Sequence, residues 1–495
     1  MKINIYSKDY SACVTDLIII PAFEQEKTNQ FLNLLGKGLA EEYQWLLKNK
    51  QFKGKFGETK SLSNTNDIAA RYVVLLGLGE KNKFDLEKLR RAAAAAHRNA
   101  KCKGAKTYLS LLSALSGFSN KEKMFVLSEA ALLTDYSFDM YKTNDKENGK
   151  KKVEELLLWS REKNLQPLLS KVKKAEIVSN NVNYCRDLVN MPPNILGPAY
   201  LASEARKLNS STLKVTVLGK KELEKGKFGG ILAVGSGSAK EPKLIVMEYN
   251  PKGAKNKKPI ALVGKGITFD AGGLNIKPTG YINNMKSDMA GAAAVISTLK
   301  AAQELGIKQR IVGVVPSCEN FLGSKAYRPD DILTMYSGKT VEVCNTDAEG
   351  RIILADALAY AEKKFGPSQM IDIATLTGAC MVALGYVATG LLTNDDKMAK
   401  DLEKAGDYCG DRVWRLPLWS DYDDMVESDI ADLRNVAPVR VAGTIEGAKF
   451  LGSFVEKTPW VHLDIAGTSF LKEPKHYNPK YATGAGVRLL LTYLG

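Results

Sequence analysis

Apolar and polar positions along this chain follow two periods, which predict strands and helices that alternate. In the first part of the chain, short apolar runs predict strands at 2–6, 16–20, 71–76, 105–112 and 124–127, and helical spacing is found from Asp85 to Ala100. From Ser179 onward, strand-like runs recur between helical stretches, at 213–218, 230–234, 243–249, 259–264, 310–315, 369–376 and 461–466. Strands that alternate with helices are typical of an α/β protein whose sheets are covered by helices.

The pattern divides the chain into two predicted domains. We expect a small N-terminal α/β domain over residues 1–150 and a larger C-terminal domain over 179–495, in which a doubly wound mixed sheet lies between layers of helices (α/β/α). The Lys-rich stretch from Lys142 to Lys152 has no apolar period and is predicted to be a loop. The helix-like segment after it, up to about Val172, would connect the domains within residues 151–178.

Composition and charge narrow the class of protein. The hydrophobic content of 45% is ordinary for a globular chain, and the apolar run from Leu17 to Phe23 is too short for a membrane span and does not resemble a signal peptide. The seven scattered cysteines predict free thiols in a reducing cytoplasm. The formal net charge of +15 makes nucleic-acid binding an alternative function. The excess is spread as single lysines and short runs without a helix-turn-helix or zinc-finger pattern, so we do not expect a nucleic-acid partner.

The turn from Asn345 to Arg351 carries the most chemical information, because it places two carboxylates and a guanidinium close together. It joins a strand-like run to helical spacing, and ligands of open α/β sheets bind where strands end. An Asp-x-Glu pair on a loop is usually solvated surface. Two further turns favour a functional interpretation, because Lys265 and Asp270 follow another buried strand and Asp288 precedes an Ala-rich helical run.

These turns supply four carboxylates, Asp270, Asp288, Asp347 and Glu349. Their summed negative charge balances the positive charge of two divalent cations. Without metal the four carboxylates would repel one another, so we favour a two-metal site. The three histidines do not lie beside these turns, so the ligands must be mostly oxygen, and such sites also accept Mn²⁺ or Mg²⁺. A dinuclear phosphatase would also use clustered acids, but it usually includes His or Asn and gives no reason for Lys265.

Several segments of the chain share one family pattern: 190–194, 264–278, 285–291, 345–351, 414–419, 428–433 and 460–467. In these segments the chain resembles the leucyl aminopeptidase (cytosol aminopeptidase) family. The resemblance is dense over about residues 175–490 and loose before them, mainly at 76–79 and 130–133. It implies a cytoplasmic homohexamer that releases N-terminal residues from short peptides, with leucine and other apolar residues preferred.

For the metal site, the resemblance implies two divalent ions per subunit, Mn²⁺ or Zn²⁺. Asp270 and Glu349 would bridge them, Asp347 would complete the first, and Lys265 and Asp288 would complete the second. An ammonium has no free lone pair, so Lys265 would bind as the neutral amine, its pKa lowered by the cations. The alternative, a phosphate-binding lysine, is disfavoured because the pattern G-x-x-x-x-G-K-[ST] is absent.

Two cationic side chains, those of Lys277 and Arg351, remain after the charge of the metals has been balanced by the four carboxylates. The resemblance implies that Lys277 binds the substrate and stabilises the developing oxyanion, and that Arg351 holds a bicarbonate ion as the general base. The motifs themselves offer no spare His or Glu as a base. The plain alternative for Arg351 is a surface arginine that pairs with a nearby acid, but Leu354 and Ala355 stand at i+3 and i+4.

The implied mechanism places the free α-amine of the peptide on one metal and its carbonyl oxygen on the other metal and Lys277, while a metal-bridging water attacks. A side-chain pocket beside the metals is implied for Met285, Thr375, Leu376, Gly378 and Ala482. From the residues alone, 375–378 is equally well explained as a strand end and turn, and a methionine such as Met285 is more often a core residue.

Overall fold

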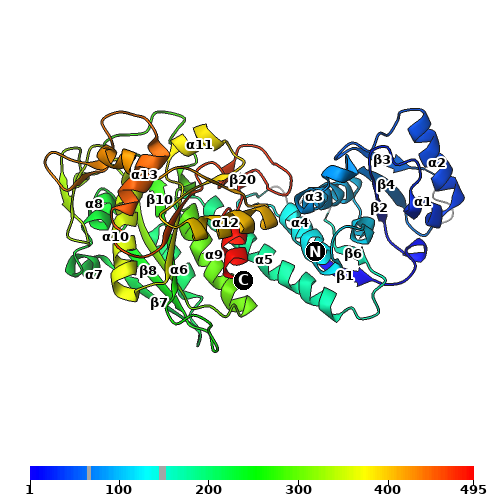
Figure 1. The fold of residues 1–495 in the computed structure, drawn as a ribbon, viewed down its shortest axis with the longest axis horizontal. Helices are drawn as coiled ribbons and strands as arrows, with labels where there is room; N and C mark the ends of the chain where they lie inside the picture. Colours follow the sequence, from blue (N-terminus) through cyan, green and yellow to red (C-terminus); the bar gives the residue numbers. More distant parts are fainter. Residues whose placement is uncertain (64–67, 144–151) are drawn as a thin grey trace. The chain divides into compact units, whose positions relative to one another are not determined.

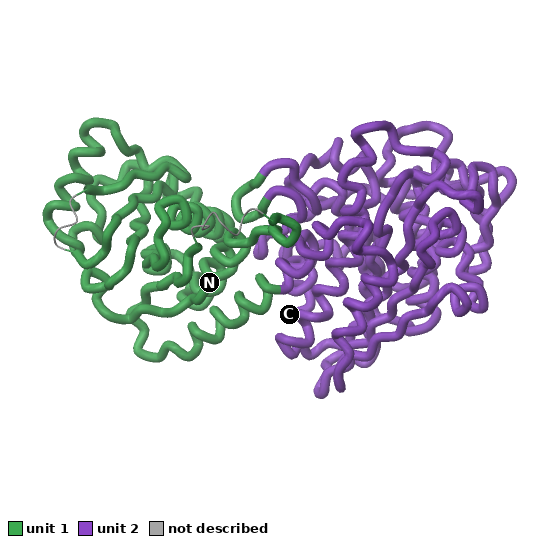
Figure 2. The backbone as a smooth tube through the Cα atoms, turned by 180° about the vertical axis from the view of Figure 1, so that it is seen from behind, with its two compact units in different colours: residues 1–180, 474–479 green, residues 181–473, 480–495 purple. Residues whose placement is uncertain are grey.

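The computed structural model of the protein describes residues 1–63, 68–143 and 152–495. They form two compact units, which Figure 2 distinguishes by colour: unit 1 is 1–180 with 474–479, and unit 2 is 181–473 with 480–495. The domain boundary expected at 150/151 and most of the loop expected over 142–152 lie outside the described residues. The division into 1–150, 151–178 and 179–495 therefore stays a prediction.

Unit 1 is built on a six-stranded sheet in the order β1-β6-β5-β2-β4-β3, parallel except for β3. Its strands are β1 (Lys2–Tyr6), β2 (Leu17–Ala22), β3 (Thr59–Leu62), β4 (Tyr72–Gly77), β5 (Thr107–Ser110) and β6 (Glu155–Trp159). Its helices are α1 (Gln30–Leu35), α2 (Lys37–Lys48), α3 (Leu86–Lys103), α4 (Asn120–Asp135) and the first part of α5 (Gln166–Asn190). Two separate hydrophobic clusters, one beneath α3 and α4 and one beneath α1 and α2, show that helices cover both faces.

Two predictions for unit 1 are wrong. Residues 124–127 lie inside α4 rather than in a strand, because Ser119 and Glu122 form a capping box that starts a helix buried on several sides. The segment expected to be helical before Val172 contains strand β6, whose Leu156 and Leu158 point into the core while it pairs with β1 and β5. Short apolar runs do not by themselves distinguish the two kinds of element.

Residues 474–479 belong to unit 1 although the chain on both sides of them belongs to unit 2. The side chain of Arg98, on α3, donates to the carbonyl oxygen of His476. The buried hydroxyl of Tyr477 lies 3.2 Å from Oε1 of Glu87, on the same helix. This short segment is therefore fastened to α3 by polar contacts.

Unit 2 contains a nine-stranded mixed sheet in the order β16-β15-β18-β14-β9-β11-β8-β7, with β10 paired to β11. Its strands are β7 (Leu213–Leu218), β8 (Lys243–Tyr249), β9 (Ile260–Gly264), β10 (Gly266–Asp270), β11 (Ile311–Asn320), β14 (Gln369–Ala374), β15 (Thr389–Thr393), β16 (Val413–Arg415) and β18 (Trp460–Asp464). Small sheets are formed by β12 (Ile332–Thr334), β13 (Thr340–Glu342) and β17 (Leu433–Arg434), and by β19 (Phe470–Leu471) and β20 (Tyr481–Ala482).

Helices lie on both faces of this sheet, as Figure 1 shows. The helices of unit 2 after α5 are α6 (Pro198–Arg206), α7 (Lys220–Lys225), α8 (Gly229–Gly235), α9 (Ala290–Leu305), α10 (Glu349–Phe365), α11 (Gly378–Leu384), α12 (Asp396–Cys409), α13 (Gly443–Gly452) and α14 (Val487–Leu494). Helix α10 packs on α8 and α13, whereas α9 packs on α14, and α14 on α12. The predicted α/β class, with a mixed sheet between helical layers in the larger part, is confirmed.

The strand expected at 230–234 is wrong, because these residues form α8. The buried carboxylate of Asp356 accepts a hydrogen bond from the backbone N–H of Ile231 at 3.0 Å and thereby satisfies a donor at the start of this short helix. Of the described helices, none combines the length and the apolar character that crossing a membrane requires.

The central strands β9, β14 and β18 run parallel and end at the same edge of the sheet. Lys265 follows β9, Thr375 follows β14, and Asp464 ends β18. The edge where these strands end is the place at which α/β sheets bind ligands.

Candidate metal centre

Three of the predicted acids converge where β10 meets the start of α10. Asp270 ends β10, Glu349 is the first residue of α10, and Asp347 lies on the turn before it. One carboxylate oxygen from each of the three lies within 4.8 Å of the others. Asp270 and Glu349 are buried and Asp347 is half-buried, so these charges are close together and poorly solvated.

The electrostatics of the acids reflect this crowding. Burial, followed by the neighbouring charges of Asp270 and Glu349, raises the pKa of Asp347 to about 7. Burial and the charge of Glu349 also raise the pKa of Asp270, and burial raises that of Asp288 well above its usual range. For Glu349, burial acts in the same direction, but Lys265 and Lys277 outweigh it and lower the pKa.

Lys265 joins Asp288 to this group. Its Nζ lies 2.8 Å from Oδ2 of Asp288 and 2.9 Å from Oε1 of Glu349, and it donates to the carbonyl oxygen of Thr375 at 3.0 Å. A Cβ atom at Gly350 would overlap Cε and Nζ of Lys265, so glycine at this position allows the lysine to pass. Burial opposes the charge of Lys265, but the two acids hold its pKa above the ordinary value. The neutral amine expected for Lys265 depends on bound cations and stays a prediction.

Lys277 lies against the other side of the acidic group. Its Nζ is 2.7 Å from Oδ2 of Asp270 and 2.5 Å from Oδ1 of Asp347, and its side chain is 15% exposed. Burial disfavours its charge, but Asp270, Glu349 and Asp347 together raise its pKa. Lys277 is therefore a cation at the rim of the carboxylate cluster, with part of its side chain open to solvent.

Arg351 has an acidic partner that its sequence neighbours did not indicate. Its Nη1 donates to Oε1 of Glu446, on α13, at 2.6 Å and to the carbonyl oxygen of Asn435 at 2.5 Å. Leu354 and Ala355, at i+3 and i+4, supply no acid, but using them to argue against an acidic partner for Arg351 was wrong, because the acid comes from a helix packed against α10. The buried guanidinium is held in a fixed place rather than free on the surface.

Further residues, which the motifs did not single out, hold the ligand turns in place. The side-chain amide of Asn320 donates to Oδ1 of Asp270 at 2.8 Å and to the carbonyl oxygen of Thr346 at 3.0 Å. The hydroxyl of Tyr327 donates to the same carbonyl at 2.7 Å. Asn320 lies opposite Asp270 in the register of β10 and β11. The feature of the sequence that could have indicated its role is a polar residue at the end of a long buried strand.

The predicted pocket residues are distributed over three segments near this edge. Met285 is half-buried in the 3-10 helix η5 (Met285–Ser287), just before Asp288. Lys286 donates to the carbonyl oxygen of Asn190, whose side-chain oxygen accepts from the N–H of Ala482. The segments that carry Met285 and Ala482 are thus joined through Asn190.

The other pocket candidates lie on the turn after β14. Thr375 and Leu376 are half-buried, and Gly378 is exposed at the start of α11. The hydroxyl of Thr375 donates to Oδ1 of Asp288 at 2.6 Å. This turn therefore contacts the acidic cluster directly.

The cluster has the donor set of a divalent cation site. It offers carboxylate oxygens and one lysine nitrogen, and oxygen-rich sets suit Mn²⁺, Mg²⁺ and, with nitrogen, Zn²⁺. Oε2 of Glu349 is buried and has no hydrogen-bond partner in the described chain. Since a buried carboxylate oxygen without a donor is costly, the residues fit a site completed by cations.

The chain is similar to known aminopeptidases over nearly its whole length. The description "Cytosol aminopeptidase family, catalytic domain" matches residues 183–491, and the N-terminal domain of the same family matches residues 19–145. A probable cytosol aminopeptidase of Geobacter sp. (strain M21) is 43% identical and covers 100% of this chain and 99% of its own length. A similarly named protein of Cenarchaeum symbiosum (strain A) is 43% identical, with 90% and 91% covered.

Solved structures agree with these relatives. A tomato leucine aminopeptidase mutant is 32% identical, with a TM-score of 0.87 and coverage of 100% of this chain and 96% of that one. The bottromycin maturation enzyme BotP in complex with Mn is 31% identical, with a TM-score of 0.84 and coverage of 97% and 98%. Because family matches account for both parts of the sequence and one relative aligns from end to end, this chain belongs to the cytosol aminopeptidase family, whose members are metal-dependent peptidases.

Proposed function

We propose that this aminopeptidase uses two divalent ions, Mn²⁺ or Zn²⁺, to release N-terminal leucine and other apolar residues from short peptides. The observation that carries the proposal is the convergence of Asp270, Asp347 and Glu349 within 4.8 Å, with the ammonium groups of Lys265 and Lys277 against them. The complex of the related BotP with Mn supports a divalent metal at such a site.

The contacts divide the proposed ligands into two overlapping groups. Asp270, Asp347 and Glu349 form the first, and Glu349 is also joined to Asp288 through Lys265. This overlap supports Glu349 as a bridging ligand. Asp270 is proposed as the second bridge, Asp347 as the further ligand of one ion, and Lys265 and Asp288 as the further ligands of the other. Four carboxylates would balance the charge of two divalent cations.

When bound, the ions would lower the pKa of a water molecule and polarise the peptide carbonyl. The chain's own residues would do the rest. Lys277, held by Asp270 and Asp347 and still partly exposed, would donate to the substrate oxygen as negative charge develops on it. Arg351, fixed through Nη1 by Glu446 and Asn435, would direct its remaining N–H groups to a bicarbonate ion that takes up the proton of the water.

Side-chain preference is proposed to come from Met285, Thr375, Leu376, Gly378 and Ala482. Support comes from their positions: Met285 precedes Asp288, and Thr375 is hydrogen-bonded to it. The exposed, side-chain-free Gly378 would leave room next to the half-buried Leu376. The apolar side chains of Met285, Leu376 and Ala482 would favour apolar side chains of the substrate.

We further propose that the enzyme works as a cytoplasmic homohexamer. Several large apolar side chains of unit 2 are more than half exposed, among them Trp414, Trp419, Ile430 and Val439. If these side chains gather in one patch, that patch would be suited to a subunit interface. Measurement of the mass in solution tests the hexamer, which a monomer would contradict.

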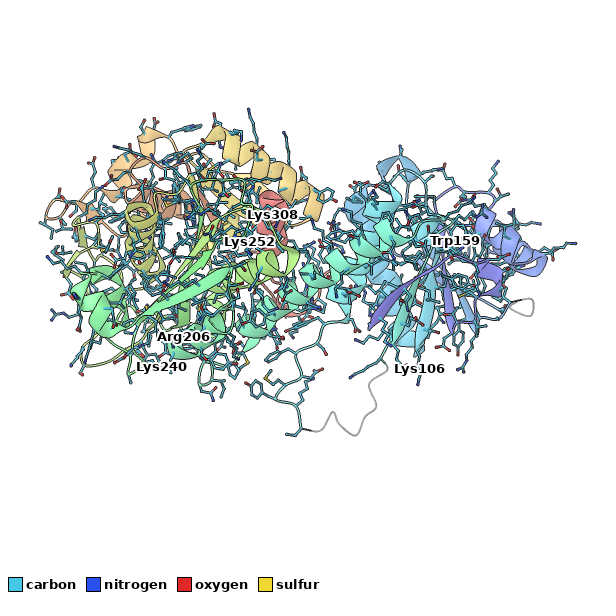
Figure 3. The ribbon with its side chains drawn as sticks, turned by 90° about the horizontal axis from the view of Figure 1, so that it is seen from below. Lys106, Trp159, Arg206, Lys240, Lys252 and Lys308 are labelled. Atoms are coloured by element: carbon cyan, nitrogen blue, oxygen red, sulfur yellow. The ribbon has the colours of Figure 1, made fainter. Side chains whose placement is uncertain are left out.

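Nucleic-acid binding is not adopted as the function. Lys240 lies before the start of β8, whereas Lys252 and Lys308 lie side by side beyond its end (Figure 3). Lys240 is also paired with Glu319 at 2.7 Å. Basic side chains at opposite ends of a strand, some already neutralised, do not favour one continuous phosphate-binding face.

The direct test is hydrolysis of a panel of aminoacyl amides by the purified full chain with Zn²⁺, Mn²⁺ or Mg²⁺ added. We expect release of leucine and other apolar residues from free N-termini, no release from N-acetylated substrates, and about two bound ions per chain. Equal hydrolysis of acetylated and free substrates would contradict an aminopeptidase of this kind.

A further inference from the structure

Asp464, the last residue of β18, is fully buried and accepts four hydrogen bonds. Its Oδ1 accepts from the backbone N–H groups of Leu376 at 3.2 Å and of Ala466 at 3.1 Å. Its Oδ2 accepts from the N–H of Thr377 at 3.1 Å and from the Thr377 hydroxyl at 2.7 Å. None of these contacts involves a proposed metal ligand, so Asp464 acts on the turn that follows β14.

That turn faces the metal centre on its other side. The carbonyl oxygen of Thr375 accepts from Nζ of Lys265 at 3.0 Å, and the Thr375 hydroxyl donates to Oδ1 of Asp288 at 2.6 Å. Leu376, the next residue, is one of the proposed pocket residues and is bonded to Asp464. A single turn therefore contacts Lys265 and Asp288, the two ligands that would complete the second ion, and also carries part of the pocket.

A carboxylate is the side chain that this arrangement requires. β14 ends at Ala374, so the N–H groups of Leu376 and Thr377 lie beyond its last ladder pair and need another acceptor. A carboxylate only accepts, and its two oxygens can take four hydrogen bonds. An asparagine at position 464 would turn its NH₂ group toward at least one backbone N–H whichever way it is oriented.

We propose that Asp464 is a positioning residue that couples the second metal position to the side-chain pocket, because it fixes the turn at residues 375–377 that contacts Lys265 and Asp288 and contains Leu376. The inference rests on the proposed function, since it uses the ligand and pocket roles given above. Loosening this turn changes metal affinity and side-chain selectivity together.

The test compares Asp464→Asn with Asp356→Asn in the full-length protein. Asp356 is a matched control, because it is equally buried and its carboxylate accepts backbone N–H groups, from Ile231 at 3.0 Å and Tyr336 at 2.7 Å, away from the turn at 375–377. Both variants lose a buried carboxylate and both are expected to lose stability.

Two readouts separate positioning from general destabilisation. In a calorimetric titration of the metal-stripped protein with Mn²⁺, Asp464→Asn should weaken one of the two binding events about 10- to 100-fold, the usual effect of removing a residue that orients a ligand. The ratio of kcat/KM for leucyl over alanyl amide should fall by at least about threefold, within the range that pocket contacts control. Asp356→Asn should leave both quantities within about twofold of the original protein.

A milder series covers the case in which Asp464→Asn does not fold. Thr377→Val removes one donor to Asp464 but keeps both backbone N–H groups, so it should shift both readouts in the same direction by less. Thr377→Ser keeps the hydroxyl and should restore both. The Thr377 hydroxyl also lies 2.9 Å from that of Thr444 and accepts from the backbone N–H of Cys380 at 3.2 Å, as the N-cap of α11. Thr444→Val is included to show that loss of the contact with Thr444 has a smaller effect, and Thr377→Ser keeps the cap.

The outcomes distinguish a failure of the role proposed for Asp464 from a failure of the proposed function. If the original protein binds two ions and cleaves aminoacyl amides but Asp464→Asn and Thr377→Val match Asp356→Asn in both readouts, only the role of Asp464 is overturned. A change in selectivity without a change in metal affinity, or the reverse, overturns the coupling. If the original protein neither binds two ions nor cleaves these substrates, the proposed function fails and the inference with it.

Discussion

Lys277→Ala is the change that best separates chemistry from metal binding at this site. The lysine lies 2.7 Å and 2.5 Å from carboxylate oxygens of Asp270 and Asp347. Its removal takes a positive charge away from the proposed ions, so it should leave their binding unchanged or strengthen it. A mutation that lowers turnover while metal affinity holds or rises identifies a residue that acts on the substrate.

The expected loss follows from the surroundings of Lys277. Removing one oxyanion-stabilising donor lowers turnover about 10²- to 10³-fold, or about 2.7–4 kcal/mol in the barrier. Lys277 shares its ammonium between two acids and has a side chain that is 15% exposed, so water can partly replace it. We therefore expect the lower end, about 10²-fold in kcat, or about 2.7 kcal/mol.

The assay measures kcat on leucyl amide and bound metal by elemental analysis for Lys277→Ala, Lys265→Ala and Lys300→Ala. Lys265→Ala should lose one ion as well as activity. Lys300 forms a surface ion pair with Glu304 at 2.5 Å and serves as the control, with a change of less than about threefold. If Lys277→Ala loses its metals while Lys265→Ala keeps them, the roles of the two lysines are exchanged. Turnover of Lys277→Ala within about threefold of the original protein would refute an oxyanion role.

Three further predictions concern metal retention, the general base and pH. Glu349→Ala should hold fewer than two ions and lose activity, and elemental analysis that returned two tightly bound ions with near-normal turnover would contradict the bridging role. Arg351→Ala should be milder, and added bicarbonate should restore part of its activity but none of that of Glu349→Ala; equal rescue of both would argue against a role of Arg351 in holding the base. In unit 1, burial and then the charge of Arg91 lower the pKa of His476 to about 4, below the 6.5 of an unfolded histidine. The stability linked to neutral His476 is therefore present above about pH 6.5 and is lost as the pH falls toward 4. Thermal unfolding followed from pH 7 to pH 4.5 should therefore show a smaller decrease for His476→Asn, which tolerates the φ of 55° at this position, and an equal decrease would refute the linkage.

The sequence was informative about the site where buried strands could be predicted. Continuous apolar runs at 259–264 and 369–376 predicted buried strands, and both are present as β9 and β14. Residues that follow such parallel strands meet at one edge, which accounts for the position of Lys265 after β9. The strand-like run before Asp347 and Glu349 forms β13 in a separate three-stranded sheet, so the rule does not account for the positions of these two acids. Their roles as metal ligands remain a proposal that metal analysis tests.

Contacts between distant segments could not be predicted in the same way. Glu446 reaches Arg351 only because α13 packs on α10, and no spacing in the sequence encodes that pair. Asn320 acts through hydrogen bonds to turns and lies in no motif. Asp464 lies in the family-pattern segment 460–467, but the sequence of that segment indicates no role for it. Helix α4 and helix α8 were mistaken in part for strands because a run of four or five apolar residues satisfies either period when both sides are buried.

The attachment of residues 474–479 to unit 1 has a consequence for the order in which the protein is completed. Synthesis proceeds from the N-terminus, so Glu87 emerges from the ribosome 390 residues before Tyr477, the phenol that approaches its carboxylate. The six-stranded sheet of unit 1 can assemble early, but the surface of α3 around Glu87 and Arg98 receives these contacts only when the chain is nearly finished. A nascent chain thus carries an unfinished N-terminal unit throughout translation of the catalytic domain. A truncation near the C-terminus is therefore also a change to the N-terminal unit.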